Sequence, residues 1–340
     1  MSESVAASEY TPALTRAAFG ALAAAVLIFL PGPMFAQLDT VEQLLVVGPL
    51  VGVPLGLGLA IRAEADLKAR RHRRALLAFQ PLAALCAVAS VLAPRGATAA
   101  TVAAPWLLFT ALVGLEGLRR LASALRARSE GATVVMTLRE PTVALHAALA
   151  FLPIGGIWHG IARAGAHPLG FSDAIVRLTA THFHFVTWVV PLFVGRILLE
   201  KSQDKRTWSD HALLLVALVG PLLVAAGITV TQLTQWRGLE TASALLLAVA
   251  LLTLGIRVLV VSGQVIRSAP ARGLLRASSL TLGLTMVLAA LYALSAWPNI
   301  PFMVRWHGVF NAIGFAVMGL LGWVIEDQHR LTKVAHAAAA

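Results

Sequence analysis

The chain has 340 residues, of which 58% are hydrophobic and 13% charged, with a mean hydropathy of +0.80 and a formal net charge of +11. A soluble chain carries roughly a quarter of charged residues, so this composition excludes an ordinary soluble protein. The positive charge does not indicate nucleic-acid binding, because lysines and arginines stand in short connections between apolar runs rather than on one basic face. The single cysteine, Cys86, excludes a disulfide within the chain.

Apolar runs of about 20 residues follow one another along the chain, and each is long enough to cross roughly 30 Å of hydrocarbon. They predict an all-α integral membrane protein in which residues 1–325 form a single polytopic transmembrane domain. Residues 326–340 are polar and then alanine-rich, and we expect them to form a frayed cytoplasmic tail. The predicted spans, about ten in number, are 14–31, 41–61, 75–93, 100–120, 142–163, 173–199, 211–231, 239–262, 275–296 and 303–325.

The distribution of basic residues predicts the orientation of these spans. Alternate connections are rich in lysine and arginine, whereas the others carry one arginine each: Arg95, Arg163, Arg237 and Arg305. Because basic loops stay on the cytoplasmic side, this alternation places both termini in the cytoplasm of a bacterium, with the protein in the inner membrane. Residues 121–141 are predicted as an amphipathic helix on the inner surface.

Glycine and proline are concentrated in the predicted span 41–61. Small residues allow helix backbones to approach closely in a membrane, and proline interrupts the helical hydrogen-bond pattern. This span is therefore predicted to be kinked and closely packed. The residues concerned are Gly48, Pro49, Gly52, Pro54, Gly56 and Gly58.

The predicted span 173–199 carries ionisable residues that are costly in hydrocarbon unless they are paired or face a wet cavity. Asp173, Arg177, Thr181 and His184 follow one another at steps of four, four and three residues, so they form one stripe on a helix. Asp173 and Arg177 are positioned to pair. His182 lies about 200° from His184 and must face a different neighbour.

Other spans supply polar partners at the same predicted depth. His307 and Asn311 share one face of the last span, and His159 lies beside Trp158 near the outer boundary of another. We expect these groups and the stripe to form one site in the outer half of the membrane that opens outward. It would take a small-molecule or ion ligand from the outer side, and the lipid bilayer would surround the whole protein.

Three stretches resemble the YndJ-like bacterial membrane protein family. Residues 168–173 read P-L-G-F-S-D, residues 178–185 read L-T-A-T-H-F-H-F, and residues 307–315 read H-G-V-F-N-A-I-G-F. The resemblance implies a multi-pass membrane protein and names no reaction. The tripeptide H-F-H is also similar to the haem-ligating helix of heme-copper oxidases, but the copper motif of that family is absent from this sequence.

Several functions are compatible with these residues. Imidazoles from His182, His184, His307 and His159 could bind a transition metal or haem, with Thr181 and Asn311 as hydrogen-bonding partners. Alternatively, a proton-coupled transporter would use the histidines to carry protons and Arg177 to hold an anion. A membrane-embedded metal-dependent enzyme has less support because no H-E-x-x-H or G-x-S-x-G motif occurs. In a structural or assembly protein the histidines would only join neighbouring helices.

Overall fold

The computed structural model describes residues 38–60, 67–126 and 139–339, which form helices and no strand. Nine helices in these ranges are long and apolar enough to cross a membrane. They correspond to nine of the ten predicted spans and confirm the all-α class. The span predicted at 14–31 and most of the predicted surface helix at 121–141 lie outside the described residues; the described beginning of the latter continues the preceding span as far as Arg126.

The first described span is interrupted by a π-helical turn, and the last contains two π-helical stretches. The first consists of α2 (Thr40–Val47), η1 (Gly48–Gly52) and α3 (Val53–Ala60). The last consists of α12 (Ile300–Phe302), η4 (Met303–Gly308), η5 (Phe310–Val317) and α13 (Met318–Ala339). The others are α4 (Leu67–Leu92), α5 (Ala97–Arg126), α7 (Pro141–Ala164), α8 (Asp173–Leu199), α9 (Trp208–Thr234), α10 (Gly238–Gln264) and α11 (Ala269–Ser295), with short 3-10 turns at Pro168–Gly170 and Gln203–Lys205.

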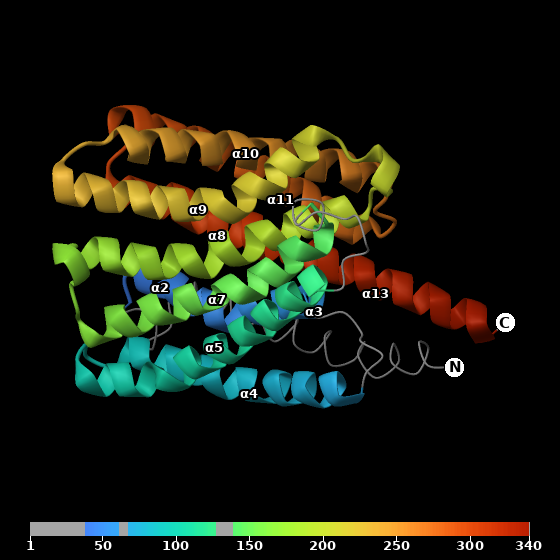
Figure 1. Ribbon diagram of the computed structural model, residues 1–340, viewed down its shortest axis with the longest axis horizontal. Coiled ribbons are helices and arrows are strands. Elements are labelled where there is room, and N and C mark those ends of the chain that lie inside the picture. Colours follow the sequence, from blue (N-terminus) through green and yellow to red (C-terminus); the bar gives the residue numbers. More distant parts are fainter. Residues whose placement is uncertain (1–37, 61–66, 127–138, 340) are drawn as a thin grey trace.

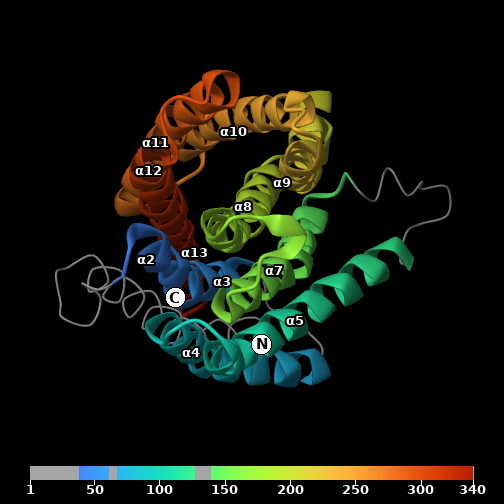
Figure 2. The ribbon, with the colours of Figure 1, turned by 90° about the vertical axis from the view of Figure 1, so that its left-hand side faces the viewer.

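Helix α8 occupies the centre of the bundle. The helices run along the long axis of the molecule (Figure 1), and in the end-on view α9, α10 and α11 follow an arc from α8 to the last span (Figure 2). In the apolar window of α8, 78% of the residues are buried, compared with 33% in each of α9, α10 and α11. Helix α8 is therefore surrounded by protein, and the helices of the arc expose most of their side chains to the surroundings.

The glycine-rich span packs closely against α8, as the sequence predicts. A Cβ on Gly48 would lie 3.0 Å from the Cβ of His184, and one on Gly56 would lie 2.5 Å from the indole nitrogen of Trp188. That indole nitrogen donates a hydrogen bond to the carbonyl of Gly52 at 3.0 Å. Glycines spaced four residues apart thus form a smooth face that admits the large side chains of α8.

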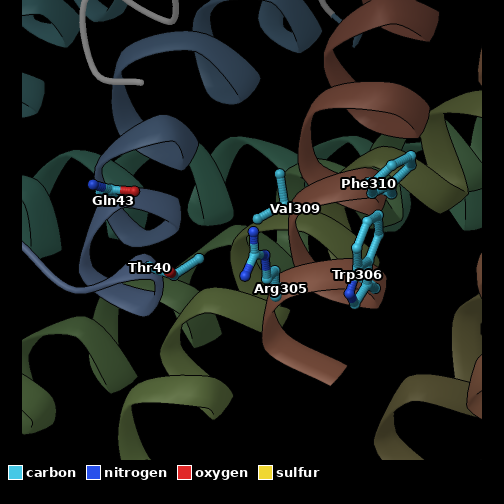
Figure 3. Close-up of a pocket in the computed structure, with 6 residues that line it drawn as sticks. All are labelled: Thr40, Gln43, Arg305, Trp306, Val309 and Phe310. Carbon is cyan, nitrogen blue, oxygen red and sulfur yellow. The ribbon is translucent and has the colours of Figure 1, made fainter. Parts of the chain in front are cut away.

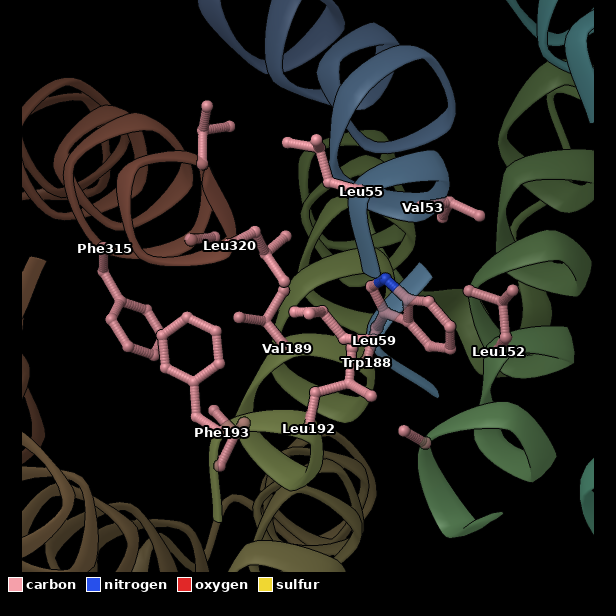
Figure 4. Close-up of a cluster of buried hydrophobic side chains, with 14 of the residues drawn as sticks. Val53, Leu55, Leu59, Leu152, Trp188, Val189, Leu192, Phe193, Phe315 and Leu320 are labelled. Atoms are coloured by element: carbon pink, nitrogen blue, oxygen red, sulfur yellow. The ribbon is translucent and has the colours of Figure 1, made fainter. Parts of the chain in front are cut away.

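The apolar core lies on both sides of α8 at this level. Trp188 and Leu192 lie against Gly56 of the glycine-rich span, and Trp188 faces Leu152 of α7 (Figure 4). On the other side, Phe193 meets Phe315 of the last span edge-to-face, with 5.1 Å between ring centroids. Trp188 and Phe193 have no accessible surface. A helix with large apolar residues on every side is expected to lie inside a bundle.

The last span is longer than the sequence predicted. Residues 326–339 continue α13 as a helix, so the expectation of a frayed tail is wrong for these residues. Glu326 explains the continuation, because its side chain is completely buried and accepts hydrogen bonds from the backbone N–H groups of Arg267 and Ser268. It also pairs with Arg330 of the same helix at 2.8 Å, and Arg330 pairs in turn with Glu200 at the end of α8.

Candidate functional site

The four histidines singled out in the sequence form two separate pairs on different sides of α8. His184 lies against His159 of α7, with ring centroids 6.1 Å apart and planes at 76°. His182 lies against His307 of η4, with centroids 6.2 Å apart and planes at 15°. This confirms that His182 and His184 face different neighbours. We call His159 and His184 the buried histidine pair, and His182 and His307 the accessible histidine pair.

His184 is completely buried, and both of its ring nitrogens have partners. Its Nδ1 lies 2.7 Å from the carbonyl oxygen of Ala180, and its Nε2 accepts a hydrogen bond from the indole N–H of Trp106 at 2.9 Å. A carbonyl can only accept and an indole can only donate, so the proton resides on Nδ1 and the ring is neutral. Gly48 and Gly155 approach the ring from two helices, which leaves it no space to rotate.

His159 is also completely buried, and it lies near the C-terminal end of α7 with its ring inside the bundle. Its Nε2 lies 2.9 Å from the hydroxyl of Ser90, which itself donates to the carbonyl of Ala87 at 2.6 Å. Because the hydroxyl has one hydrogen, it must accept from the Nε2–H of His159. The Nδ1 of His159 is then an acceptor, and it has no hydrogen-bond partner in the structure.

The accessible histidine pair has free hydrogen-bonding capacity. The Nδ1 of His307 lies 3.0 Å from the carbonyl oxygen of Thr285 and must donate to it, so Nε2 carries the lone pair of the neutral ring. His182 makes no hydrogen bond to another described side chain and keeps an exposed surface, although protein atoms surround it. Asn311 lies next to this pair, and its side-chain oxygen is 2.8 Å from the hydroxyl of Thr285.

This arrangement gives little support to the metal or haem interpretation. Among the described residues, no group of three or more histidine, cysteine, aspartate or glutamate side chains is placed to hold a metal ion. The lone pair of His184 is already used by Trp106, and Thr181 donates its hydroxyl hydrogen to the carbonyl of Arg177 at 3.0 Å. The sequence suggested a single site built from His182, His184, His307 and His159. This site does not form, because two of the rings lie on one side of α8 and two on the other.

An ion network closes the end of the bundle at which α8 begins, and we call this the network end. Arg177 pairs with Asp173 at 3.0 Å, as the sequence predicted, and also with Asp39, the N-cap residue of α2. Arg95 pairs with Asp173 and lies 3.6 Å from Glu42. The network contains three carboxylates and three guanidinium groups: Asp39, Glu42, Asp173, Arg95, Arg163 and Arg177.

The balanced charges of the network change the role expected for Arg177. Three carboxylates surround its guanidinium group, so it is not free to hold an anionic ligand. Asp39 is half-exposed. Burial alone would raise its pKa, but hydrogen bonds from Arg177 and from the backbone N–H groups of Glu42 and Val41, together with the charge of Arg177, lower the pKa below its usual 3.8. Arg163 is almost completely buried and donates to the carbonyl of Ala93 at 2.6 Å.

Sequence reasoning found only part of this network. It identified Asp173 and Arg177 but not Asp39 and Glu42, whose signal is the capping box that they form at the start of α2. It also missed buried ion pairs at the opposite end of the bundle. There Arg196 pairs with Asp327 at 2.5 Å, and Asp210 pairs with Lys201 and Arg257.

Comparisons with known proteins agree with the membrane architecture. The family model described as "YndJ-like protein" matches residues 43–315. A Bacillus subtilis (strain 168) protein described as "Uncharacterized membrane protein YndJ" is 25% identical over 296 residues, which cover 86% of this chain and 50% of the relative. The chain thus spans about half the length of that relative. No solved structure matches.

Proposed function

The chain belongs to the YndJ-like family and is a polytopic membrane protein, and on this premise we propose that it is a proton-coupled transporter of a small anionic solute. The observation that carries the proposal is the accessible histidine pair. Two imidazoles with unused hydrogen-bonding capacity lie within a membrane bundle, and one of them keeps an exposed surface. Ionisable groups at such positions typically belong to ligand or proton pathways.

The spacing of the pair favours the uptake of one proton. With 6.2 Å between the ring centroids, a proton on His182 repels a second proton on His307. The Nε2 of His307 is the basic nitrogen available in its neutral ring, because Nδ1 donates to Thr285. The pair therefore provides one exchangeable positive charge on a site that is otherwise neutral.

The surroundings of the pair favour an anionic solute. Among the described residues, no aspartate or glutamate forms a group with His182 and His307, so a proton on this pair has no carboxylate beside it as counter-ion. A bound anion would supply that counter-ion, and the side-chain amide of Asn311 stands close enough to contribute a hydrogen bond. Proton and anion would then bind together as a neutral unit, which is the basis of proton-coupled anion transport.

A pH-jump measurement tests the proton site without knowledge of the solute. Wild-type protein in liposomes, adsorbed on a solid-supported membrane, should give a transient current when the external pH changes. His182→Gln and His307→Gln should lose most of this current, whereas His336→Gln, which alters an exposed histidine far along α13, should keep it. An unchanged current in both site variants would refute the proton site.

A second measurement tests the solute class. Liposomes loaded with a pH-sensitive dye should acidify inside when a monovalent anion such as nitrate, chloride or gluconate is added outside, and only if the accessible histidine pair is intact. Elemental analysis of the purified protein serves as the control for the metal interpretation. Stoichiometric metal that disappears in His182→Gln and His307→Gln would overturn the transporter proposal.

A further inference from the structure

A groove at the network end has a composition suited to a phospholipid. Its volume is about 390 Å³, and it lies between α2 and the beginning of the last span (Figure 3). The residues that line it are Thr40, Gln43, Arg305, Trp306, Val309 and Phe310. None of them belongs to the ion network or to either histidine pair.

Arg305 supplies an unneutralised positive charge in this groove. It is exposed, and within the described ranges it makes no ion pair; its guanidinium carbon lies 5.9 Å from the ring centroid of Trp306. This contrasts with the arginines of the network, each of which lies within 4 Å of a carboxylate. Figure 3 shows the side chain of Arg305 extending from the last span toward Thr40 of α2.

An exposed ladder of aromatic rings runs along the last span on both sides of Arg305, with Phe302 before it and Trp306 and Phe310 after it. Phe302, Trp306 and Phe310 follow at steps of four residues, with centroid distances of 6.0 Å and 5.5 Å between successive rings. Their exposed fractions are 40%, 41% and 37%. Aromatic residues at such depths lie at the boundary between lipid headgroups and acyl chains.

We infer that this groove binds a phospholipid, with the phosphate on Arg305 and an acyl chain along Trp306 and Phe310. Arg305 is five residues into the span, near the level of headgroup phosphates, and guanidinium groups hold phosphate through paired charge-assisted hydrogen bonds. The hydroxyl of Thr40 and the side chain of Gln43 offer further polar contacts on the α2 side. The aromatic ladder distinguishes a lipid from free phosphate, which has no acyl chain to cover it.

Native mass spectrometry of the full chain in mild detergent, titrated with phosphatidylglycerol, tests this site. Loss of one charge-assisted contact corresponds to about a tenfold weaker affinity, which is the change expected for Arg305→Gln. The matched control is Arg237→Gln, which alters an exposed arginine at the same end that already has a partner in Glu240 at 3.7 Å. This control should bind phosphatidylglycerol as wild type does.

A second variant and a competitor separate lipid from free phosphate. Trp306→Ala should weaken phosphatidylglycerol binding severalfold, because the acyl chain loses its aromatic surface. Inorganic phosphate at millimolar concentration should not displace the lipid from wild-type protein. Displacement by phosphate, or equal phosphatidylglycerol binding by wild type and Arg305→Gln, would overturn the inference.

Discussion

Trp106→Phe should destabilise the protein through the hydrogen bond that the indole donates to His184. The two side chains are completely buried, and the donor and acceptor nitrogens are 2.9 Å apart. The phenylalanine ring would leave Nε2 of His184 without a donor, at a cost of about 1–3 kcal/mol for an unpaired buried acceptor. Measured interhelical hydrogen bonds in membranes average about 0.6 and reach about 1.7 kcal/mol, which favours the lower half of that range.

A double-mutant cycle isolates this contribution from the change in side-chain volume. The free energy of unfolding in mixed detergent micelles would be measured for wild type, Trp106→Phe, His184→Ala and the double variant. We expect a coupling of about 1 kcal/mol, because Trp106→Phe removes no hydrogen bond once His184 is absent. Trp208→Phe, at a tryptophan with 81% exposure, should change stability by less than about 0.5 kcal/mol. A coupling below about 0.3 kcal/mol would refute the hydrogen bond and the tautomer assigned from it.

Three further predictions concern packing, pH and the long last helix. Gly56→Ala should cost about 1–3 kcal/mol of unfolding free energy, because its Cβ would lie 2.5 Å from an indole nitrogen. Gly52→Ala should be tolerated, because the atom nearest to its Cβ would be 3.7 Å away. Equal costs for the two variants would contradict the close approach at Gly56. Because the folded-state pKa of Asp39 is lowered, its contribution to stability is present above the usual pKa of 3.8 and is lost as the pH falls further. When the pH is lowered, Asp39→Asn should therefore lose less unfolding free energy than wild type. Glu326→Gln should cost about 1–2 kcal/mol of unfolding free energy by weakening the hydrogen bonds to the start of α11. Asp204→Asn, at an exposed residue, should cost nothing measurable in the same unfolding assay.

The spans and the faces of α8 were predictable because each depends on local periodicity. Apolar length determines where a helix can cross the membrane, and an angle of about 100° per residue separates His182 from His184 whatever surrounds them. The pairing of Asp173 with Arg177 follows from the same spacing. These predictions needed no knowledge of the neighbouring helices.

The partners of each face were not predictable, because they depend on how distant helices are arranged. The sequence predicted that His159 and His184 share one site, and the two rings do meet, but nothing in it indicated that His182 and His307 would form a separate pair. Likewise, Asp39 lies 138 positions before Arg177, and only the fold brings the two charges together. The single four-histidine site assumed that equal depth meant proximity, but α8 itself separates the pairs.

The three carboxylates and three guanidinium groups of the ion network have a consequence for how the protein responds to membrane voltage. An electric field does work only on net charge that moves through it, about 2.3 kcal/mol per elementary charge for each 100 mV. A rearrangement that carries all six groups together transfers no net charge, so voltage neither drives nor opposes it. Neutralising one carboxylate, as in Glu42→Gln, would give the same movement a positive charge and make it sensitive to voltage.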